Sequence, residues 1–199
     1  MPHAKIEFRP IVLASGSPHR RELLAKLGLP FQSASPEIDE RSHPGERPES
    51  LALRLGKDKA VALAPRFPAH LIIGSDQVAL LDGRQLHKPG DAANTCSQLR
   101  AAAGKSVDFY TSICVLDTSS GECRADLDRT RVHFRTLSDQ QIRHYVERDQ
   151  PFDCAGGFKS EGLGIALFEK LETEDPNALV GLPLIRLVRL LDTFGVSVI

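Results

Sequence analysis

Segments with hydrophobic residues at helical spacing alternate along the chain with short apolar or alternating segments. This pattern predicts a mixture of helices and strands. Apolar residues at helical spacing predict helices over residues 18–28, 48–64, 91–103, 138–147 and 177–191. Short apolar runs predict strands at residues 11–15, 31–35 and 164–171, and residues 70–81 are extended up to the turn Asp82-Gly83. Residues 106–117 and 122–135 alternate and are joined by Ser119-Ser120-Gly121, which predicts a long hairpin. Helices that alternate with strands predict an α/β fold, a single domain over residues 1–199 with a mixed, largely central β-sheet flanked by helices.

Capping and turn residues support several of these boundaries. Ser17 is expected as the N-cap of the first helix, Pro18 as its first residue and Gly28 as its stop. Gly56 weakens the helical pattern of the second helix, and Pro183 is expected either near the start of the last helix or at a bend in it.

The composition agrees with one ordinary globular domain and limits the kinds of ligand. The chain has 199 residues, with 25 Lys and Arg against 26 Asp and Glu, and a formal net charge of -1. Such a chain has no overall field that attracts a polyanion, so an anionic ligand has to be held by a local cluster of charges. We therefore expect no nucleic-acid polymer among its partners.

The cysteines and the N-terminus bear on the compartment. Cys96, Cys114, Cys123 and Cys154 are scattered and form no CxxC pair, which is typical of reduced thiols rather than of a disulfide framework or a zinc site. The N-terminal MPHAKIEF has no apolar core of the signal-peptide type, and no stretch approaches the roughly 18 uncharged apolar residues of a membrane span. These features predict a cytoplasmic protein that does not enter a membrane.

The first cluster of residues that could bind a ligand or take part in a reaction is Ser15-Gly16-Ser17-Pro18-His19-Arg20-Arg21. It lies at the end of the first predicted strand and the start of the first predicted helix. Backbone N–H groups of the helix N-terminus, two hydroxyls and two guanidiniums converge there, and such groups bind phosphate oxygens. The structural alternative is that Ser17 only caps the helix and the arginines are solvated.

A second cluster is Gly74-Ser75-Asp76-Gln77, which follows a buried apolar run and brings a carboxylate to its end. Such a carboxylate could hold a divalent cation or take a proton from water, although an Asp here also suits a simple turn. Lys59 and Lys88 are further candidates for contacts to phosphate, but a single lysine is usually solvated.

The third cluster is the glycine-rich segment from Cys154 to Gly164, which surrounds Lys159, Ser160 and Glu161 with four glycines. This loop allows backbone to approach a flat ligand, and Glu161 could accept the paired N–H donors along the edge of guanine. The alternative is a glycine-rich turn with an exposed glutamate.

Together these motifs resemble those of the Maf-type nucleoside triphosphate pyrophosphatases. The resemblance is carried by LASGSPHRRELL (Leu13 to Leu24), the Lys59-Ala60 pair, IIGSDQV (Ile72 to Val78), HKP (His87 to Pro89), CAGGFKSEGLGIALFE (Cys154 to Glu169) and DPNALVGLPL (Asp175 to Leu184). It spans almost the whole chain, with the motifs in the family's order, and it implies the Maf/ITPase-like version of the α/β fold.

What the resemblance implies is hydrolysis of a nucleoside triphosphate between its α and β phosphates, with a divalent cation, Mg²⁺, Mn²⁺ or Co²⁺. Asp76 would accept the proton of the attacking water. Glu40, which lies in the acidic stretch after the second strand, is expected to help Asp76 hold the cation. The residues expected to bind and neutralise the triphosphate are Ser15, Ser17, Arg20, Lys59 and Lys88.

Three positions point to a subgroup. Maf proteins that act on dTTP and UTP typically read SPRR, SDT and GIQG where this chain has His19, Gln77 and Glu161, and the present pattern resembles the YceF-type subgroup, which prefers 7-methyl-GTP. Methylation at N7 makes the base cationic, so it would stack on an aromatic ring and be attracted by Glu161. This subgroup is expected to carry Trp or Tyr at position 19, and because His stacks less strongly, we expect lower selectivity here.

The leading hypothesis is therefore a 7-methyl-GTP pyrophosphatase that clears modified nucleotides. One alternative is a Maf pyrophosphatase of broader or dTTP/UTP specificity, and another is a nucleotide-binding regulator of cell division. A homodimer is also expected, although the leucines of the last helix serve equally well as core.

Overall fold

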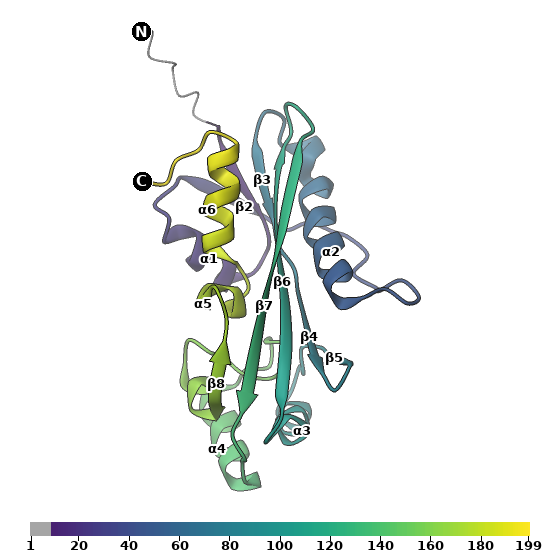
Figure 1. The fold of residues 1–199 in the computed structure, drawn as a ribbon, viewed down its shortest axis with the longest axis vertical. Helices are drawn as coiled ribbons and strands as arrows, with labels where there is room; N and C mark the ends of the chain where they lie inside the picture. The colour runs from purple at the N-terminus through teal and green to yellow at the C-terminus, as the bar shows by residue number, and fades with distance from the viewer. Residues whose placement is uncertain (1–8) are drawn as a thin grey trace.

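A mixed sheet of eight strands forms the centre of the molecule, and helices cover both of its faces (Figure 1). The structure is a computed structural model that describes residues 9–199, so the N-terminal MPHAKIEF lies outside the described residues. The strands are β1 (Ile11–Ala14), β2 (Phe31–Ala34), β3 (Leu71–Gly74), β4 (Gln77–Leu81), β5 (Arg84–Leu86), β6 (Ser106–Asp117), β7 (Cys123–Phe134) and β8 (Phe168–Glu172). The α-helices are α1 (Pro18–Ala25), α2 (Pro48–Leu63), α3 (Ala92–Ala102), α4 (Asp139–Asp149), α5 (Pro176–Val180) and α6 (Leu184–Thr193). The predicted fold class is confirmed.

The long hairpin of β6 and β7 organises the sheet. The strand order is β2-β1-β3-β6-β4-β5, with β7 on the other edge of β6 and β8 beyond β7. β1 is parallel to β2 and β3, whereas every other pairing is antiparallel. β3 and β4 lie end to end along the same edge of β6 and share one register, from Leu71 opposite Asp117 to Leu81 opposite Val107. The predicted hairpin is confirmed.

Alternation along the strands builds a core on each face of the sheet. Ile11, Leu13 and Ile73 point to the face covered by α1 and α6, where Leu187 packs against them. The intervening residues Val12, Ala14 and Ile72 face α2, with Ala60 and Leu63. At the other end of the hairpin, α3 and α4 close a third cluster around the edge-to-face rings of Phe109, Phe134 and Phe158.

Local capping predictions are largely confirmed. The Ser17 side chain accepts a hydrogen bond from the Arg20 amide at the start of α1, and Ser138 forms a reciprocal capping box with Gln141 in α4. Gly28 has a positive φ of 68°, as its role after the first helix requires. Pro183 is the N-cap of α6 rather than a bend within a helix.

Three segments differ from the sequence-based expectation. Residues 70–81 contain two strands, interrupted at Ser75 and Asp76, and β5 was not expected. Residues 163–167 form a 3₁₀ helix before β8 begins. The C-terminal helix is split into α5 and α6 at Gly181, whose φ of 121° is incompatible with a continuing helix.

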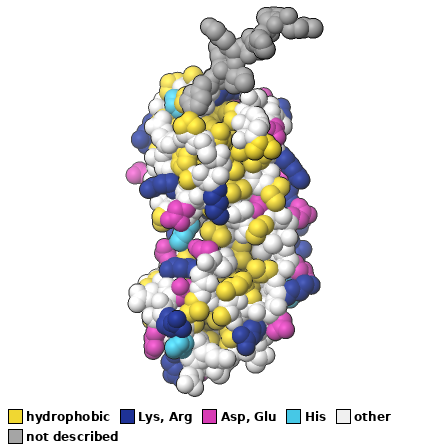
Figure 2. All heavy atoms as spheres, turned by 90° about the vertical axis from the view of Figure 1, so that its left-hand side faces the viewer, with side chains coloured by type: hydrophobic (Ala, Val, Ile, Leu, Met, Phe, Trp, Pro, Cys, Tyr) yellow, Lys and Arg dark blue, Asp and Glu magenta, His cyan; other side chains and the backbone are white. Residues whose placement is uncertain are grey.

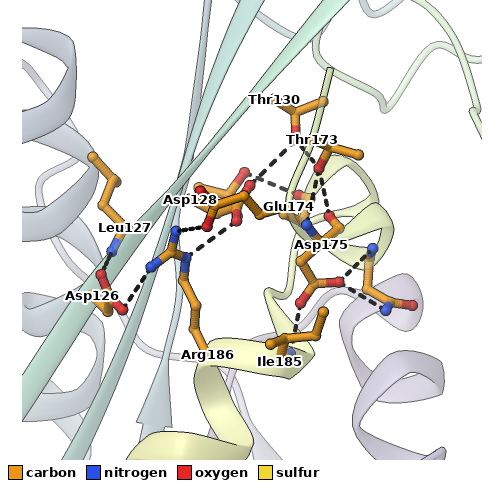
Figure 3. A network of polar contacts seen from close by, with 12 residues as sticks. Asp126, Leu127, Asp128, Thr130, Thr173, Glu174, Asp175, Ile185 and Arg186 are labelled. Carbon is orange, nitrogen blue, oxygen red and sulfur yellow. Dashed lines mark hydrogen bonds and ion pairs between the residues drawn. The ribbon is translucent and has the colours of Figure 1, made fainter. Parts of the chain in front are cut away.

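An ion-pair network joins α6 to the hairpin (Figure 3). The guanidinium of Arg186 donates to Asp126 at 2.8 Å, to Asp128 at 3.1 Å and to Glu174 at 2.8 Å. Beside it, Asp175 caps α5 through the Asn177 amide and accepts the Ile185 amide at 2.7 Å. Side chains thus fix the course of the chain between β8 and α6.

The molecular surface carries apolar side chains on one side. Figure 2 shows them on the face where α6, α5, β8 and α4 lie, with charged side chains among them and at its borders. Within residues 9–199, no helix combines the length and the apolar character that a bilayer crossing demands.

Candidate active site

A cavity of about 700 Å³ opens at the C-terminal end of β1. The sequence-predicted site residues all contribute to its lining, and they are Ser15, Ser17, His19, Arg20, Glu40, Lys59, Asp76, Gln77, Lys88 and Glu161. The fold therefore gathers them from α1, α2, the break between β3 and β4, the first residue of β4, and four loops. Their individual roles stay predictions.

The interruption between β3 and β4 places Asp76 in the cavity wall. β1 pairs with β3 only as far as Ile73, and β5 pairs with β4 only from Ala79, so residues 75–77 have no strand beside them on that edge. On the other edge, the Ser112 amide donates to the Asp76 carbonyl at 2.9 Å, and the Ser112 hydroxyl accepts from the Asp76 amide at 3.0 Å. The Asp76 backbone is therefore held by β6 while its side chain faces the opening.

Lys59 lies between two carboxylates. Its ammonium nitrogen is 2.5 Å from Oδ1 of Asp76 and 2.8 Å from Oε1 of Glu40. Lys59 and Asp76 are both buried, whereas Glu40 is exposed at the rim. The hydrogen bond from Lys59 is the main cause that lowers the pKa of Glu40, with the charges of Lys88 and Arg20 acting in the same direction. Oδ2 of Asp76 makes no hydrogen bond within the described chain, so it remains available to water.

Two glycines allow α2 to approach the sheet closely enough for this contact. A Cβ atom at Gly56 would overlap the Ser112 hydroxyl, and one at Gly74 would overlap the Gly56 carbonyl. A glycine in the middle of a helix normally costs about 1 kcal/mol, which made Gly56 a weakness in the sequence pattern. Here it is what brings Lys59 next to Asp76.

Arg20 is anchored at the opposite wall. Its Nε donates to the Gly181 carbonyl at 2.8 Å, and the Ser75 hydroxyl donates to the same carbonyl at 2.9 Å. Burial lowers the pKa of the Arg20 guanidinium, and the charges of Asp76 and Glu40 act against that shift. Next to it, the Ser15 hydroxyl accepts the Ser17 amide at 3.1 Å and so shapes the turn before α1. The motif around α5 thus serves to place the carbonyl that orients Arg20.

Gln77 is fixed in one orientation. Its amide nitrogen lies 3.1 Å from the Ala178 carbonyl, 3.0 Å from the Leu179 carbonyl and 3.0 Å from the Thr111 hydroxyl. Backbone carbonyls accept and cannot donate, so the nitrogen has to face them and the oxygen of the amide faces the other way. Gln77 lines the cavity, and its oxygen accepts no hydrogen bond from residues 9–199.

His19 lies between two acidic side chains at the other end of the cavity. Its Nδ1 is 3.3 Å from Oε1 of Glu161, and its Nε2 is 3.9 Å from Oδ2 of Asp153. The sequence analysis did not single out Asp153. This end of the cavity combines a flat ring with two negative charges, an arrangement that attracts a flat cation.

The loop that carries Glu161 is tied to α4. The Tyr145 hydroxyl donates to Asp149 at 2.8 Å and accepts the Lys159 amide at 3.1 Å, while the Lys159 ammonium donates to the Asp149 carbonyl at 2.9 Å. Gly156 and Gly157 turn the chain with φ values of 82° and 72° and pack against neighbouring side chains. These contacts hold the loop in one conformation, and Glu161 within it is exposed, as the simpler alternative of a glycine-rich turn also expects.

Cys154 also lines the cavity, but its thiol is a poor nucleophile. Burial, reinforced by Asp153, raises the pKa of the Cys154 thiol to about 12. A thiol reacts through its thiolate, so a raised pKa opposes covalent catalysis at neutral pH.

Asp76 and Glu40 fit a hard divalent cation. Two carboxylates that already converge on one ammonium supply the oxygen donors that Mg²⁺ and Mn²⁺ prefer, and a triphosphate would bring further oxygens. Such an ion would share these carboxylates with Lys59.

Residues that position the site were missed because they act through remote contacts. Ser112 and Thr111 are fully buried polar residues in the middle of β6, and each holds a cavity residue. The only signal in the sequence is a pair of hydroxyls inside an otherwise apolar run.

Comparison with known proteins identifies the family of the chain. The family model described as Maf-like protein matches residues 10–194. The chain belongs to the Maf family. A protein of Nitrosococcus oceani named 7-methyl-GTP pyrophosphatase is 51% identical over 189 residues, which cover 95% of each chain. A protein of the same name from Pseudomonas aeruginosa is 53% identical over 188 residues, 94% of this chain and 98% of that one. A solved nucleoside-triphosphatase / dITP/XTP pyrophosphatase from Mycobacterium abscessus is 18% identical, covers 94% of both chains and has a TM-score of 0.43.

Proposed function

We propose that this Maf-family chain hydrolyses a nucleoside triphosphate between the α and β phosphates, with 7-methyl-GTP as the preferred substrate. The observation that carries the proposal is that Oδ2 of Asp76, which makes no hydrogen bond with residues 9–199, lies in a cavity that Arg20 and Lys88 also line. The full-length relatives that bear the name 7-methyl-GTP pyrophosphatase support the choice of base.

The reaction requires a water molecule, a proton acceptor and neutralisation of the phosphates. In the proposed reaction, water attacks the α-phosphorus and its proton passes to Asp76. The bond between the α-phosphorus and the bridging oxygen breaks, and the products are pyrophosphate and the nucleoside monophosphate. Ser15, Ser17, Arg20 and Lys88 bind the triphosphate, and Lys59 neutralises charge next to Asp76.

Asp76 and Glu40 are the proposed ligands of a divalent cation. When bound, Mg²⁺, Mn²⁺ or Co²⁺ supplies neutralisation of the phosphate oxygens. The pairing of both carboxylates with Lys59 supports this, since a site that holds an ammonium between two acids is suited to a cation.

The proposed specificity rests on charge. The methylated base is cationic, so Glu161 and the ring of His19 stabilise it, whereas an uncharged pyrimidine gains less from them. The oxygen of Gln77 is the proposed acceptor for an N–H of the purine, because its nitrogen is used by the chain itself.

The chemistry is tested by measuring pyrophosphate release from 7-methyl-GTP, GTP, dTTP, UTP, CTP and ATP, each with Mg²⁺, Mn²⁺ or Co²⁺. We expect the Asp76→Asn variant to lose turnover by roughly 10²–10⁴ while nucleotide affinity stays within a few-fold. Asp82→Asn, at an exposed turn, is the matched control and should retain full activity. Unchanged turnover in Asp76→Asn would remove this residue from the mechanism.

The base preference is tested separately with Glu161→Gln, which removes charge but keeps size. We expect its selectivity for 7-methyl-GTP over UTP to fall more than its total activity. Glu169→Gln, an exposed residue after the loop, is the control. Equal losses on both substrates contradict the charge argument.

The same assays separate the alternatives. Preference for dTTP or UTP would keep the chemistry and change the substrate. Nucleotide binding without turnover on any substrate would favour a regulator of cell division.

The remaining proposals concern surroundings and assembly. We place the protein in the cytoplasm, where thiols stay reduced, because its four cysteines are free thiols. The proposed small-molecule partner is the nucleotide. The proposed homodimer is supported by the apolar face in Figure 2, and sedimentation equilibrium tests it. Leu184, Leu187 and Leu191 of α6 are core residues, so they are not free for that interface.

A further inference from the structure

His19, Asp153 and Cys154 form a second group of potential metal ligands, separate from Asp76 and Glu40. One donor atom of each of the three residues lies within 4.8 Å of the other two. No hydrogen bond or ion pair between residues 9 and 199 joins this group to Lys59, Asp76 or Glu40. The two groups are therefore distinct in contacts as well as in chemistry.

We propose that His19, Asp153 and Cys154 bind a zinc ion at the base end of the cavity. A thiolate sulfur, an imidazole nitrogen and a carboxylate oxygen are the ligand types that zinc prefers, whereas Mg²⁺ takes oxygen ligands only, so zinc binding releases the proton of the Cys154 thiol to water. Three protein ligands leave a fourth position for water or another molecule.

A carboxylate already lies next to the His19 ring. Zinc-bound histidines usually donate their second ring N–H to an acidic side chain, which fixes the ring and strengthens it as a ligand. Nδ1 of His19 is 3.3 Å from Oε1 of Glu161, while Nε2 faces Asp153 at 3.9 Å. With the metal on Nε2, Glu161 has the position of that supporting carboxylate.

Only a small movement is required to close the site. In tetrahedral zinc sites, ligand atoms are roughly 3.5 Å apart, so the three donors have to approach one another by roughly 1 Å. The Asp153 side chain is 63% exposed and can rotate, and the Cys154 thiol lies 3.5 Å from Oδ1 of Asp153. The three residues come from two segments, the start of α1 and the loop after α4, that meet at the cavity.

Zinc at this place has a consequence that rests on the proposed function. The ion would bind Nε2 of His19 and offset the charge of Glu161. In the proposed function, these two residues stabilise the cationic base. Zinc should therefore compete with 7-methyl-GTP and leave the triphosphate end unaffected.

Binding is tested without nucleotide, using Co²⁺ as a coloured substitute for Zn²⁺. We expect the wild-type protein to bind Co²⁺ with thiolate-to-cobalt absorption in the near ultraviolet, and excess Zn²⁺ to remove that absorption. Cys154→Ala should lose the band. Asp153→Asn and Glu161→Gln should bind at least about tenfold more weakly, the usual effect of losing a ligand or its supporting carboxylate.

Cys123→Ala is the matched control. Cys114 and Cys123 are two neighbouring thiols with sulfurs 3.0 Å apart, so they are the other place in the described chain where cobalt could bind a thiolate. The proposal is overturned if the band persists in Cys154→Ala, whatever Cys123→Ala shows, or if wild-type protein shows no thiolate band. A second measurement uses only the wild-type protein, so it tests the site even if a variant does not fold. Zinc should protect Cys154 from iodoacetamide, as mapped by mass spectrometry, and equal labelling with and without zinc would refute the site. Since none of these measurements uses turnover, their failure is separable from failure of the proposed function.

Discussion

Replacing Arg186 with methionine would leave a buried carboxylate without its cation. Arg186 is 18% exposed and pairs with three acids, but only Asp128 is fully buried, with 1% of its side chain exposed. Asp126 and Glu174 are 44% and 81% exposed, so water replaces the guanidinium there and these two pairs contribute little. The effect of the substitution therefore depends mainly on Asp128.

The expected size follows from burial. Removing one partner of a buried ion pair costs roughly 3–5 kcal/mol. Because the guanidinium is partly open to solvent, water can approach Asp128 in the variant, and we expect the lower end, about 3 kcal/mol. For a chain of this length each kcal/mol corresponds to roughly 2–4 °C, so the melting temperature should fall by roughly 6–12 °C.

The loss should depend on pH. Burial raises the pKa of Asp128 in the folded protein, and Arg186 opposes that shift. A carboxyl that binds its proton more tightly in the folded than in the unfolded state costs stability once the pH exceeds its raised pKa, and this cost disappears as the pH falls. Without Arg186 the pKa rises further. The difference in unfolding free energy between wild type and Arg186→Met should therefore narrow as the pH falls from neutral and Asp128 takes up its proton in the variant.

Chemical denaturation at several pH values measures these differences, with Arg189→Met on the exposed side of the same helix as the control. Adding Asp128→Asn to Arg186→Met should restore more than half of the lost stability, because the buried charge is then gone. A loss that is independent of pH and unchanged in the double variant would refute the assignment to Asp128.

Three other substitutions test how the cavity is held together. Gly56→Ala should destabilise the protein by about 1–3 kcal/mol and reduce turnover, because the added methyl group pushes α2 away from Ser112, as chemical denaturation and steady-state assays would show. Arg20→Ala should raise KM and lower kcat together in steady-state kinetics, since phosphate contacts serve both binding and the transition state. Tyr145→Phe should cost about 1–3 kcal/mol by leaving the Lys159 amide without its partner, and should raise KM for 7-methyl-GTP more than for UTP, because the loop with Glu161 loosens.

Each of these expectations has a result that contradicts it. If alanine at position 56 stabilises the protein, as it does in most helices, the close approach of α2 to β6 is wrong. Kinetics of Arg20→Ala that match those of the exposed neighbour Arg21→Ala would mean that Arg20 does not touch the phosphates. Equal changes in KM on both substrates for Tyr145→Phe would remove the loop from base selection.

Local signals in the sequence predicted most elements, because caps and hydrophobic periods act over a few residues. Ser17 and Ser138 mark helix starts that the structure confirms. The interruption at Ser75 and Asp76 was not predicted, although an Asp after an apolar run also suits a turn, because the ends of the pairings with β1 and β5 depend on residues far away in the sequence.

For the site, the sequence identified residues that share one cavity but not the contacts among them. The pairing of Lys59 with Asp76 depends on how closely α2 approaches β3, which two glycines far apart in the sequence decide together. Asp153 was missed for the same reason, because an exposed acid in a loop becomes notable only when folding brings His19 next to it.

The shared register of β3 and β4 along β6 makes the length of this segment as constrained as its composition. Side chains in a strand alternate between the two faces, so inserting or deleting one residue between positions 71 and 81 would move Asp76 to the opposite face or unpair one of the two strands from β6. Insertions and deletions should thus be absent here among active relatives, even where individual residues vary. A relative whose alignment has a gap in this segment would be a chain in which the carboxylate corresponding to Asp76 is displaced from the cavity or lost.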